Sequence, residues 1–323
     1  MEQTLYEEIP SLDLAEFYNG DEARKQAFVS ALGNAYQNIG FVAVRNHFLD
    51  ADLQAGLYDA IRKLFALPAE VKQKYELPAI AGQRGYTGKG KEHAKGRNTG
   101  DLKEFYHVGQ ELTAAELASE GYPANVWPEE VPELKTLAVQ TYRALEKTGV
   151  YMLRAIACHL NLPEDYFDDK VRNGNSILRP IHYYPIENPD AVPPDAVRAA
   201  EHGDINLITL LMGASAEGLE VLRHDGRWIP ITALPEQLVV NVGDMLERLT
   251  NGVLKSTIHR VVNPPRALMN TPRYSIPFFL HPRSDMSLAA LPQCVTATNA
   301  KRWDDITAGA FLDQRLAEIG LKK

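Results

Sequence analysis

The chain has 323 residues, of which 45% are hydrophobic and 24% charged, so it can bury a large core, and a disordered or fibrous protein is excluded. Its formal charge of −8 excludes a general attraction to nucleic acid or to an anionic membrane. No apolar run approaches the roughly 20 residues that span a bilayer, and the N-terminal residues lack a secretory signal. We therefore expect a cytoplasmic protein, monomeric by default, whose partner is a small molecule.

The first half of the chain is predicted to be mainly helical. Apolar residues recur at helical spacing over residues 14–38, 51–75 and 132–160. A short strand is expected at 41–44. Residues 1–160 are therefore predicted to form a mainly helical region that packs against a sheet.

After residue 175 the pattern changes to short β-type runs bounded by turn residues. The dipeptide Asp225-Gly226 stands between two of these runs and predicts a hairpin. The spacing favours an antiparallel barrel or jelly roll over alternating strand and helix units, and hence an α+β protein. The predicted strands are residues 176–184, 206–212, 219–223, 228–231, 237–242, 256–262 and 273–280.

The whole chain, 1–323, is expected to form one globular unit. Its jelly-roll core is predicted at residues 175–282, and a C-terminal extension with a helix at 283–323. The proline-rich stretch 185–194 is predicted to be a surface connection.

One segment of this acidic chain is locally basic. Residues 84–97 contain five Lys and Arg residues against the single acid Glu92. Residues 85–91 have the spacing of a phosphate-binding loop, but Glu92 stands where such a loop needs a hydroxyl for magnesium, so we exclude a nucleotide site. Two interpretations stay open: a solvated loop, or a lid that attracts an anionic substrate.

A candidate metal site begins with His202 and Asp204. In an extended segment, side chains two residues apart point to the same face of a sheet. With 9 His and 42 acidic residues, roughly one such pair is expected by chance, so the pair needs support. His259, in the predicted strand 256–262, offers a third ligand. Two histidines and one carboxylate form the facial triad of non-haem Fe(II) oxygenases, although zinc also accepts this set.

A candidate anion clamp follows at Arg273 and Ser275, again two residues apart in an extended run. The planar guanidinium can bind a carboxylate through two parallel hydrogen bonds, and the hydroxyl adds a donor on the same face. A dicarboxylate that chelates a metal at one end would need such a clamp at the other.

These motifs, His202-x-Asp204, His259 and Arg273-x-Ser275, resemble the pattern of the isopenicillin N synthase-like family of 2-oxoglutarate/Fe(II) oxygenases. The resemblance covers nearly the whole chain, with further matching blocks in the same order at residues 9–14, 40–41, 84–86, 101–106 and 241–244. It implies a double-stranded β-helix core with a mainly helical N-terminal region around it.

The resemblance also implies an activity. It predicts an oxidoreductase, a 2-oxoglutarate/Fe(II)-dependent dioxygenase, with Fe(II), 2-oxoglutarate and O₂ as cofactors. The reaction would be hydroxylation, desaturation or cyclisation of a small organic metabolite, with release of succinate and CO₂, and an anionic substrate stays open. His202, Asp204 and His259 would bind the iron, while Arg273 and Ser275 would hold the distal carboxylate of 2-oxoglutarate.

Five further residues receive predicted roles from the same resemblance. Tyr184 matches a tyrosine that donates to the distal carboxylate in similar enzymes. Arg84, Tyr86, His182 and Phe279 are expected at the substrate pocket, although Phe279 is equally well interpreted as a core aromatic. Two alternatives stay open: an Fe(II) oxidase of the same fold that does not use 2-oxoglutarate, and a non-catalytic binding protein.

Overall fold

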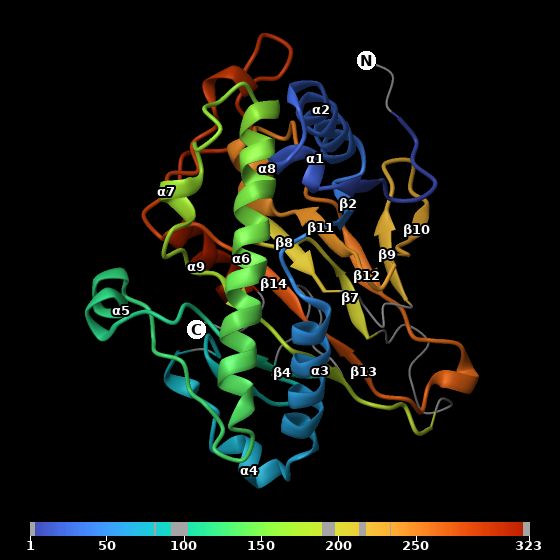
Figure 1. Cartoon of the computed structure of the whole chain (residues 1–323), viewed down its shortest axis with the longest axis vertical. Helices are drawn as coiled ribbons and strands as arrows, with labels where there is room; N and C mark the ends of the chain where they lie inside the picture. Colours follow the sequence, from blue (N-terminus) through green and yellow to red (C-terminus); the bar gives the residue numbers. More distant parts are fainter. Residues whose placement is uncertain are drawn as a thin grey trace.

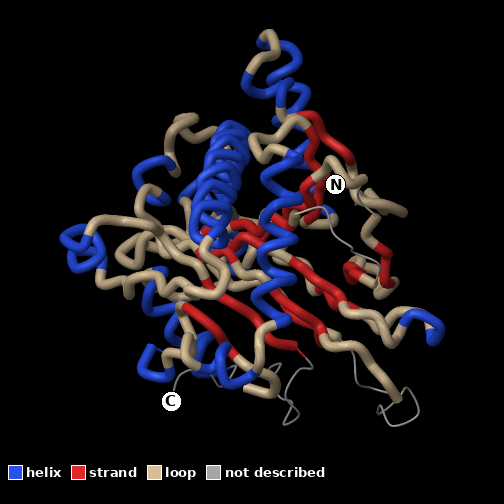
Figure 2. Tube along the Cα trace, turned by 60° about the horizontal axis from the view of Figure 1, so that its bottom comes forward, coloured by secondary structure: helices blue, strands red, loops and turns tan. Residues whose placement is uncertain are grey.

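The computed structural model describes residues 4–80, 82–91, 103–188, 198–212, 218–232 and 234–318. In the described residues the strands form three sheets (Figures 1 and 2). The six-stranded sheet has the order β1-β2-β11-β8-β14-β5, and the two four-stranded sheets have the orders β10-β9-β12-β7 and β13-β6-β4-β3. Apart from β1 and β2, which are parallel, all neighbouring strands are antiparallel. The strands are β1 (Ser11–Asp13), β2 (Phe41–Arg45), β3 (Gly85–Thr87), β4 (Lys103–His107), β5 (Ile177–Leu178), β6 (Ile181–Tyr183), β7 (Ala199–His202), β8 (Ile208–Leu211), β9 (Leu219–Leu222), β10 (Trp228–Pro230), β11 (Leu238–Val242), β12 (His259–Val261), β13 (Arg273–Ser275) and β14 (Pro277–Leu280).

Helices cover one face of the six-stranded sheet. The long helix α6 crosses the front of Figure 1, with α3 beside its lower half and α2 near its upper end. No helix in the described ranges is long and apolar enough to cross a membrane. The helices are α1 (Ala15–Tyr18), α2 (Glu22–Asn38), α3 (Ala51–Ala66), α4 (Ala69–Gln73), α5 (Ala114–Glu120), α6 (Glu133–His159), α7 (Asp168–Val171), α8 (Asp244–Leu249) and α9 (Ala308–Glu318).

The alternation of side chains along β11 separates two interiors. Leu238, Val240 and Val242 belong to the larger core, which lies between the sheet and the helices. Val239 and Asn241 face the other way, into a cavity inside the jelly roll. This period of two follows from the pleat of a strand. The six-stranded sheet is thus buried on both faces, and its inner face is available for a site.

Two of the three predicted helices are interrupted. The stretch 14–38 divides into α1 and α2 because Asp21 caps a new helix N-terminus with its side chain. The stretch 51–75 divides into α3 and α4 because Pro68 lacks a backbone N–H and disfavours helical geometry in the residue before it. The stretch 132–160 is confirmed as the single helix α6.

The predicted jelly roll is confirmed, but two of its predicted strands divide. The run 176–184 forms β5 and β6, and the run 273–280 forms β13 and β14. In both cases one half pairs in the six-stranded sheet and the other half in the third sheet. Pro180 lies at the first break and Pro277 follows the second, where a residue without an N–H interrupts a ladder at little cost.

The hairpin at Asp225-Gly226 is confirmed, with Gly226 in the left-handed region at φ 86° between β9 and β10. Strands β3, β4 and β7 and helix α8 are elements that the periodicity did not predict. The helix expected in 283–323 is α9.

The predicted division between 1–160 and 175–282 does not divide the sheets. Strands β1 and β2 pair into the six-stranded sheet beside β11, and β3 and β4 pair beside β6. The predicted helical region therefore contributes strands to the jelly roll itself.

Of the basic segment 84–97, only residues up to 91 lie in the described part, so the lid interpretation falls mostly outside it. Residues 189–194 of the predicted surface connection also lie outside the described ranges.

Candidate active site

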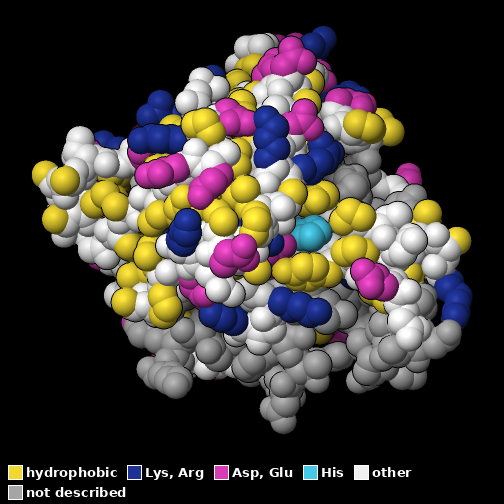
Figure 3. All heavy atoms as spheres, turned by 90° about the horizontal axis from the view of Figure 1, so that it is seen from below, with side chains coloured by type: hydrophobic (Ala, Val, Ile, Leu, Met, Phe, Trp, Pro, Cys, Tyr) yellow, Lys and Arg dark blue, Asp and Glu magenta, His cyan; other side chains and the backbone are white. Residues whose placement is uncertain are grey.

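A cavity of about 500 Å³ lies inside the jelly roll, with its lining drawn from all three sheets. The lining includes the three predicted metal ligands and both residues of the predicted carboxylate clamp, which are His202, Asp204, His259, Arg273 and Ser275. The face of the molecule seen in Figure 3 exposes a histidine among hydrophobic side chains, with charged side chains around them.

The two histidines face each other across paired strands. His202 ends β7 and His259 begins β12, and the two residues are directly opposite in the antiparallel ladder. Asp204 Oδ1 lies 3.9 Å from His202 Nε2 and 3.7 Å from His259 Nε2. Two atoms that each bind one ion at about 2.1 Å are at most about 4.2 Å apart, and both distances from Asp204 Oδ1 meet this limit. All three ligand atoms lie within 4.8 Å of one another. In the part of the chain that the structure describes, this is the one group of three such side chains that could hold a metal ion.

Hydrogen bonds orient each of the three side chains. His202 Nδ1 lies 2.7 Å from the Ala200 carbonyl oxygen, and His259 Nδ1 lies 3.2 Å from that of Thr257. Each ring therefore carries its proton on Nδ1 and presents the lone pair of Nε2 to the cavity. The other carboxylate oxygen, Asp204 Oδ2, accepts hydrogen bonds from Thr209 Oγ1 at 2.6 Å and Asn241 Nδ2 at 2.8 Å.

The electrostatics of the cluster match its geometry. Although 43% of the His202 side chain is exposed, desolvation by the protein atoms around its ring, and then the neighbouring His259, lower its pKa to about 4. Burial alone would raise the pKa of Asp204, but the two imidazoles and the donors on Oδ2 outweigh it, so the pKa is lowered. At neutral pH, a neutral imidazole and an ionised carboxylate thus face one point, as a divalent cation requires.

The carboxylate clamp lies on β13, in the same cavity. Arg273 and Ser275 are both buried and, two residues apart on one strand, project to the same face. The guanidinium of Arg273 lies over the ring of Tyr183, its partner in the β6 ladder, with Cζ 5.0 Å from the ring centroid. A metal site and an anion clamp therefore share one cavity, which suits a ligand with a chelating end and a distal carboxylate.

Comparison with known families decides the assignment. Residues 174–282 match the family model of the 2OG-Fe(II) oxygenase superfamily, and residues 9–130 match the model described as non-haem dioxygenase in morphine synthesis, N-terminal. The chain belongs to the 2OG-Fe(II) oxygenase superfamily. This oxygenase is an oxidoreductase whose cofactors are Fe(II), 2-oxoglutarate and O₂, as its sequence predicted.

Similar proteins cover the chain almost end to end. The oxygenase is 32% identical to the proline hydroxylase buaE of Petromyces alliaceus, over 96% of this chain and 99% of that protein. Among solved structures, it is similar to a putative 2OG-Fe(II) oxygenase family protein from Caulobacter crescentus, with 45% identity, a TM-score of 0.86 and coverage of 96% and 99%. It also resembles a full-length Neurospora crassa protein solved in complex with alpha-KG and thymine, with 32% identity, a TM-score of 0.85 and 96% of each chain covered.

The role predicted for Tyr184 is contradicted. Tyr184 does not line the cavity, whereas the preceding residue, Tyr183, does. Consecutive residues of an extended chain point to opposite faces of the sheet. The Tyr184 hydroxyl instead forms hydrogen bonds with Glu104 and Tyr86, and burial raises its pKa. Tyr183 is therefore the tyrosine that this structure places beside Arg273.

The substrate role predicted for Arg84 is also contradicted. Its side chain is completely buried and does not line the cavity. The guanidinium packs against Gly109 so closely that a Cβ atom there would lie 2.0 Å from Cζ. Its Nη1 donates to the carbonyl oxygen of Gln83 at 2.7 Å, and it is Gln83 that reaches the cavity wall. Arg84 therefore supports the wall from behind.

Tyr86 and His182 also lie outside the cavity, contrary to the prediction. The Tyr86 hydroxyl donates to Glu104 Oε2 at 2.5 Å, and His182 Nδ1 lies 2.7 Å from Glu104 Oε1. Both belong to a buried cluster on the opposite face of the third sheet. Phe279 lines the cavity, as expected for a pocket aromatic.

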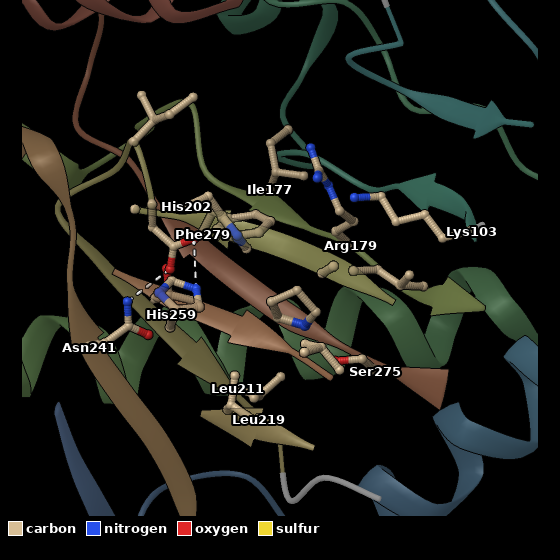
Figure 4. A pocket seen from close by; sticks show the side chains of 18 of the residues that line it. Lys103, Ile177, Arg179, His202, Leu211, Leu219, Asn241, His259, Ser275 and Phe279 are labelled. Carbon is tan, nitrogen blue, oxygen red and sulfur yellow. Dashed lines mark hydrogen bonds and ion pairs between the residues drawn. The ribbon is translucent and has the colours of Figure 1, made fainter. Parts of the chain in front are cut away.

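Sequence reasoning missed a set of polar residues at the other side of the cavity. Figure 4 shows Lys103 and Arg179 on the side of the cavity away from His259 and Asn241. The Arg179 guanidinium lies over the ring of Phe279, with Cζ 5.1 Å from the centroid. A signal was present in the alternation of the predicted strand 176–184, because Arg179 has the same parity as Tyr183 and faces the same way.

His107 also lines the cavity, and it holds Arg179 in place. Its Nε2 accepts a hydrogen bond from Arg179 Nε at 2.5 Å, while its Nδ1 lies 2.6 Å from the Gly82 carbonyl oxygen. The ring is therefore neutral, with its proton on Nδ1. This chain of contacts fixes the direction from which the guanidinium enters the cavity.

Proposed function

We propose that His202 Nε2, Asp204 Oδ1 and His259 Nε2 bind Fe(II), and that Arg273 and Ser275 bind the distal carboxylate of 2-oxoglutarate. The observation that carries this proposal is the meeting of these five side chains in one cavity. Bound iron, with 2-oxoglutarate and O₂, supplies the oxidant for a substrate C–H bond, and succinate and CO₂ are released.

The protein's own residues have positioning tasks in this reaction. The backbone carbonyls at Ala200 and Thr257 keep both imidazoles in the metal-binding tautomer, and the donors on Asp204 Oδ2 leave Oδ1 directed at the metal. Tyr183 packs under the Arg273 guanidinium and keeps its plane fixed. The cavity then orients one substrate bond toward the metal and limits access of water.

The substrate is proposed to be a small anionic molecule. The cations Lys103, Arg179 and Arg273 line the cavity, as does the carboxylate of Asp204. Two guanidinium groups and one ammonium group in the lining favour a ligand that carries negative charge.

The wall beside these cations suits a compact substrate with a flat or apolar part. Phe279 presents its ring to the cavity next to the Arg179 guanidinium, so a carboxylate and an adjoining apolar group could be held together. The similar proteins include one named a proline hydroxylase and one crystallised with thymine. Both names concern small polar molecules, which supports the size class.

A cytoplasmic location, a monomeric state and the absence of nucleic-acid and membrane partners stay predictions from the sequence.

The test of the cofactor site is an anaerobic titration of the metal-free protein with Fe(II) and then 2-oxoglutarate, followed by its visible charge-transfer band. We expect a band in the wild type, no band in His259→Ala, and a band only at much higher 2-oxoglutarate concentration in Arg273→Met. Bound iron without a band would favour the oxidase alternative. No bound iron would refute the ligand assignment.

The test of substrate class measures succinate formation with a panel of small carboxylic acids and their amides. We expect the acids to stimulate turnover more than the amides, and Arg179→Met to remove that preference while leaving the KM for 2-oxoglutarate within about twofold. The matched control is Arg143→Met on the exposed side of α6, which should change neither. Equal stimulation by acids and amides would refute the anionic substrate.

A further inference from the structure

One face of the third sheet lines the cavity, and the opposite face has no part in the proposed reaction. The residues on the opposite face form a row across β4, β6 and β13 that lies next to the row on the cavity face. On the cavity side, Lys103, Tyr183 and Arg273 are direct neighbours across β4, β6 and β13. On the opposite side, Glu104, His182 and Tyr274 are direct neighbours across the same three strands. Each residue of the second row is bonded in sequence to one of the first.

Glu104 is the centre of the second row. Its side chain is completely buried, and both of its carboxylate oxygens accept hydrogen bonds. Oε2 accepts from Lys72 Nζ at 2.8 Å and from the Tyr86 hydroxyl at 2.5 Å, and Oε1 lies 2.7 Å from His182 Nδ1. These donors come from α4, β3 and β6, so one carboxylate connects a helix with three strands.

Aromatic stacking extends the row to β13. The His182 ring is stacked on Tyr274, with centroids 4.9 Å apart and planes 16° apart. Phe65 of α3 lies against both rings, at 5.6 Å and 6.4 Å. Lys72 Nζ also donates to the Phe65 carbonyl oxygen at 3.0 Å, which ties the α3–α4 corner to the same cluster. Tyr274 stands between the two clamp residues in sequence, so its position constrains theirs.

We propose that Glu104 is a positioning residue for 2-oxoglutarate binding, acting through His182 and Tyr274 on the clamp at Arg273 and Ser275. This inference rests on the proposed function, because it takes Arg273 as the 2-oxoglutarate residue.

The physical argument concerns the strands. Strand β13 is three residues long and, among the described strands, lies at the edge of the third sheet, so its ladder provides few hydrogen bonds to fix its position. The Arg273 guanidinium must meet a carboxylate in a planar, bidentate geometry, which tolerates little displacement. Side chains that hold the opposite face of β13 in place therefore affect how tightly Arg273 binds the carboxylate of 2-oxoglutarate.

The experiment compares Glu104→Gln with wild type by anaerobic titration of the full-length protein, first with Fe(II) and then with 2-oxoglutarate. Glutamine has the same shape but leaves the buried Lys72 ammonium without a negative partner. We expect the Kd for 2-oxoglutarate to rise about tenfold, which corresponds to about 1.4 kcal/mol, while the Kd for Fe(II) stays within about twofold.

The control is Asp225→Asn, which neutralises one of the two carboxylates paired with the buried Arg223 at the end of β9. It should lower stability but leave the Kd for 2-oxoglutarate unchanged. An unchanged Kd in Glu104→Gln, or an equal change in both variants, would overturn the proposal and leave Glu104 with a structural role alone.

A second variant separates charge from shape. In Lys72→Met/Glu104→Gln no buried charge is left unpaired, so we expect this variant to recover at least half of the lost 2-oxoglutarate affinity on a logarithmic scale. Tyr86→Phe removes one hydrogen-bond donor to Glu104 without leaving a buried charge unpaired. The Kd of this variant for 2-oxoglutarate is expected to rise about threefold. Tyr86→Phe therefore tests the proposal if Glu104→Gln does not fold. No change in Tyr86→Phe, or no recovery in the double variant, would contradict the proposed coupling.

Arg273→Met, measured beside these variants, keeps the two proposals distinguishable. If Arg273→Met leaves the Kd for 2-oxoglutarate unchanged, the proposed cofactor site fails, and the inference about Glu104 fails with it. If Arg273→Met weakens binding and the Glu104 variants do not, the inference alone fails.

Discussion

The buried Glu104 carboxylate should make the folded protein depend on pH by an amount that its contacts predict. Burial alone would raise its pKa, but His182, Lys72 and Tyr86 outweigh burial and lower the pKa from 4.5 to about 2. Because the folded-state pKa is lowered, the stabilisation is fully present above the unfolded-state pKa and is lost as the pH falls through the folded-state pKa. At about 1.36 kcal/mol per pKa unit, the full contribution is on the order of 3 kcal/mol.

Of this contribution, about 1.4 kcal/mol should be lost between pH 7 and about pH 3.5. The assay is urea unfolding of wild type and Glu104→Gln at both pH values. We expect the difference in unfolding free energy between the two proteins to shrink by about 1.4 kcal/mol at the lower pH. The control is Thr148→Val, a buried substitution in α6 without a titrating group, whose difference from wild type should be the same at both pH values. A pH-independent difference for Glu104→Gln would refute the reasoning.

Three further predictions follow from the described contacts. Thr209→Val removes a donor to Asp204 Oδ2, so the affinity for Fe(II), measured by calorimetry under argon, should fall about 10- to 100-fold; an unchanged affinity would show that Asp204 is oriented without it. Gly149→Ala would place a Cβ 2.2 Å from Leu280 Cδ1 where α6 crosses β14, so urea unfolding should show a loss of about 1–3 kcal/mol, and no loss would mean that the helix shifts freely. Removal of metal by a chelator should lower the melting temperature of wild type, because a ligand at about 100 times its Kd stabilises the folded protein by about 2.7 kcal/mol. If the chelator lowers the melting temperature of His259→Ala equally, the stabilising metal binds at another site.

The candidate site could be predicted from sequence where its chemistry depends on local spacing. His202 and Asp204, and likewise Arg273 and Ser275, stand two residues apart, and the pleat of a strand puts such pairs on one face whatever the strand contacts. The side-chain types then indicate a metal as the ligand of the first pair and a carboxylate as the ligand of the second. The long helix α6 was predictable for a similar reason, because its apolar face recurs with the helical period over seven turns without an internal proline or cap.

Positions that depend on strand pairing could not be predicted in this way. Residues 177–184 alternate between two faces in any extended conformation, but only the pairing of β6 with β13 decides that Tyr183, rather than Tyr184, lies beside Arg273. The same pairing places His182 against Glu104 and away from the substrate. The resemblance to the family suggested roles for Tyr184 and His182, but it did not show which face of the third sheet each side chain occupies.

The sequence by itself indicated the pair His202 and Asp204, the pair Arg273 and Ser275, and the long helix, because each depends on residue types and on spacing within one element. Only the tertiary structure decided which charges enter the cavity. Arg84 is buried behind the wall, whereas Arg179 and Lys103 face the cavity. Their places depend on contacts between segments far apart in the chain, and the energy of such contacts is absent from any local pattern.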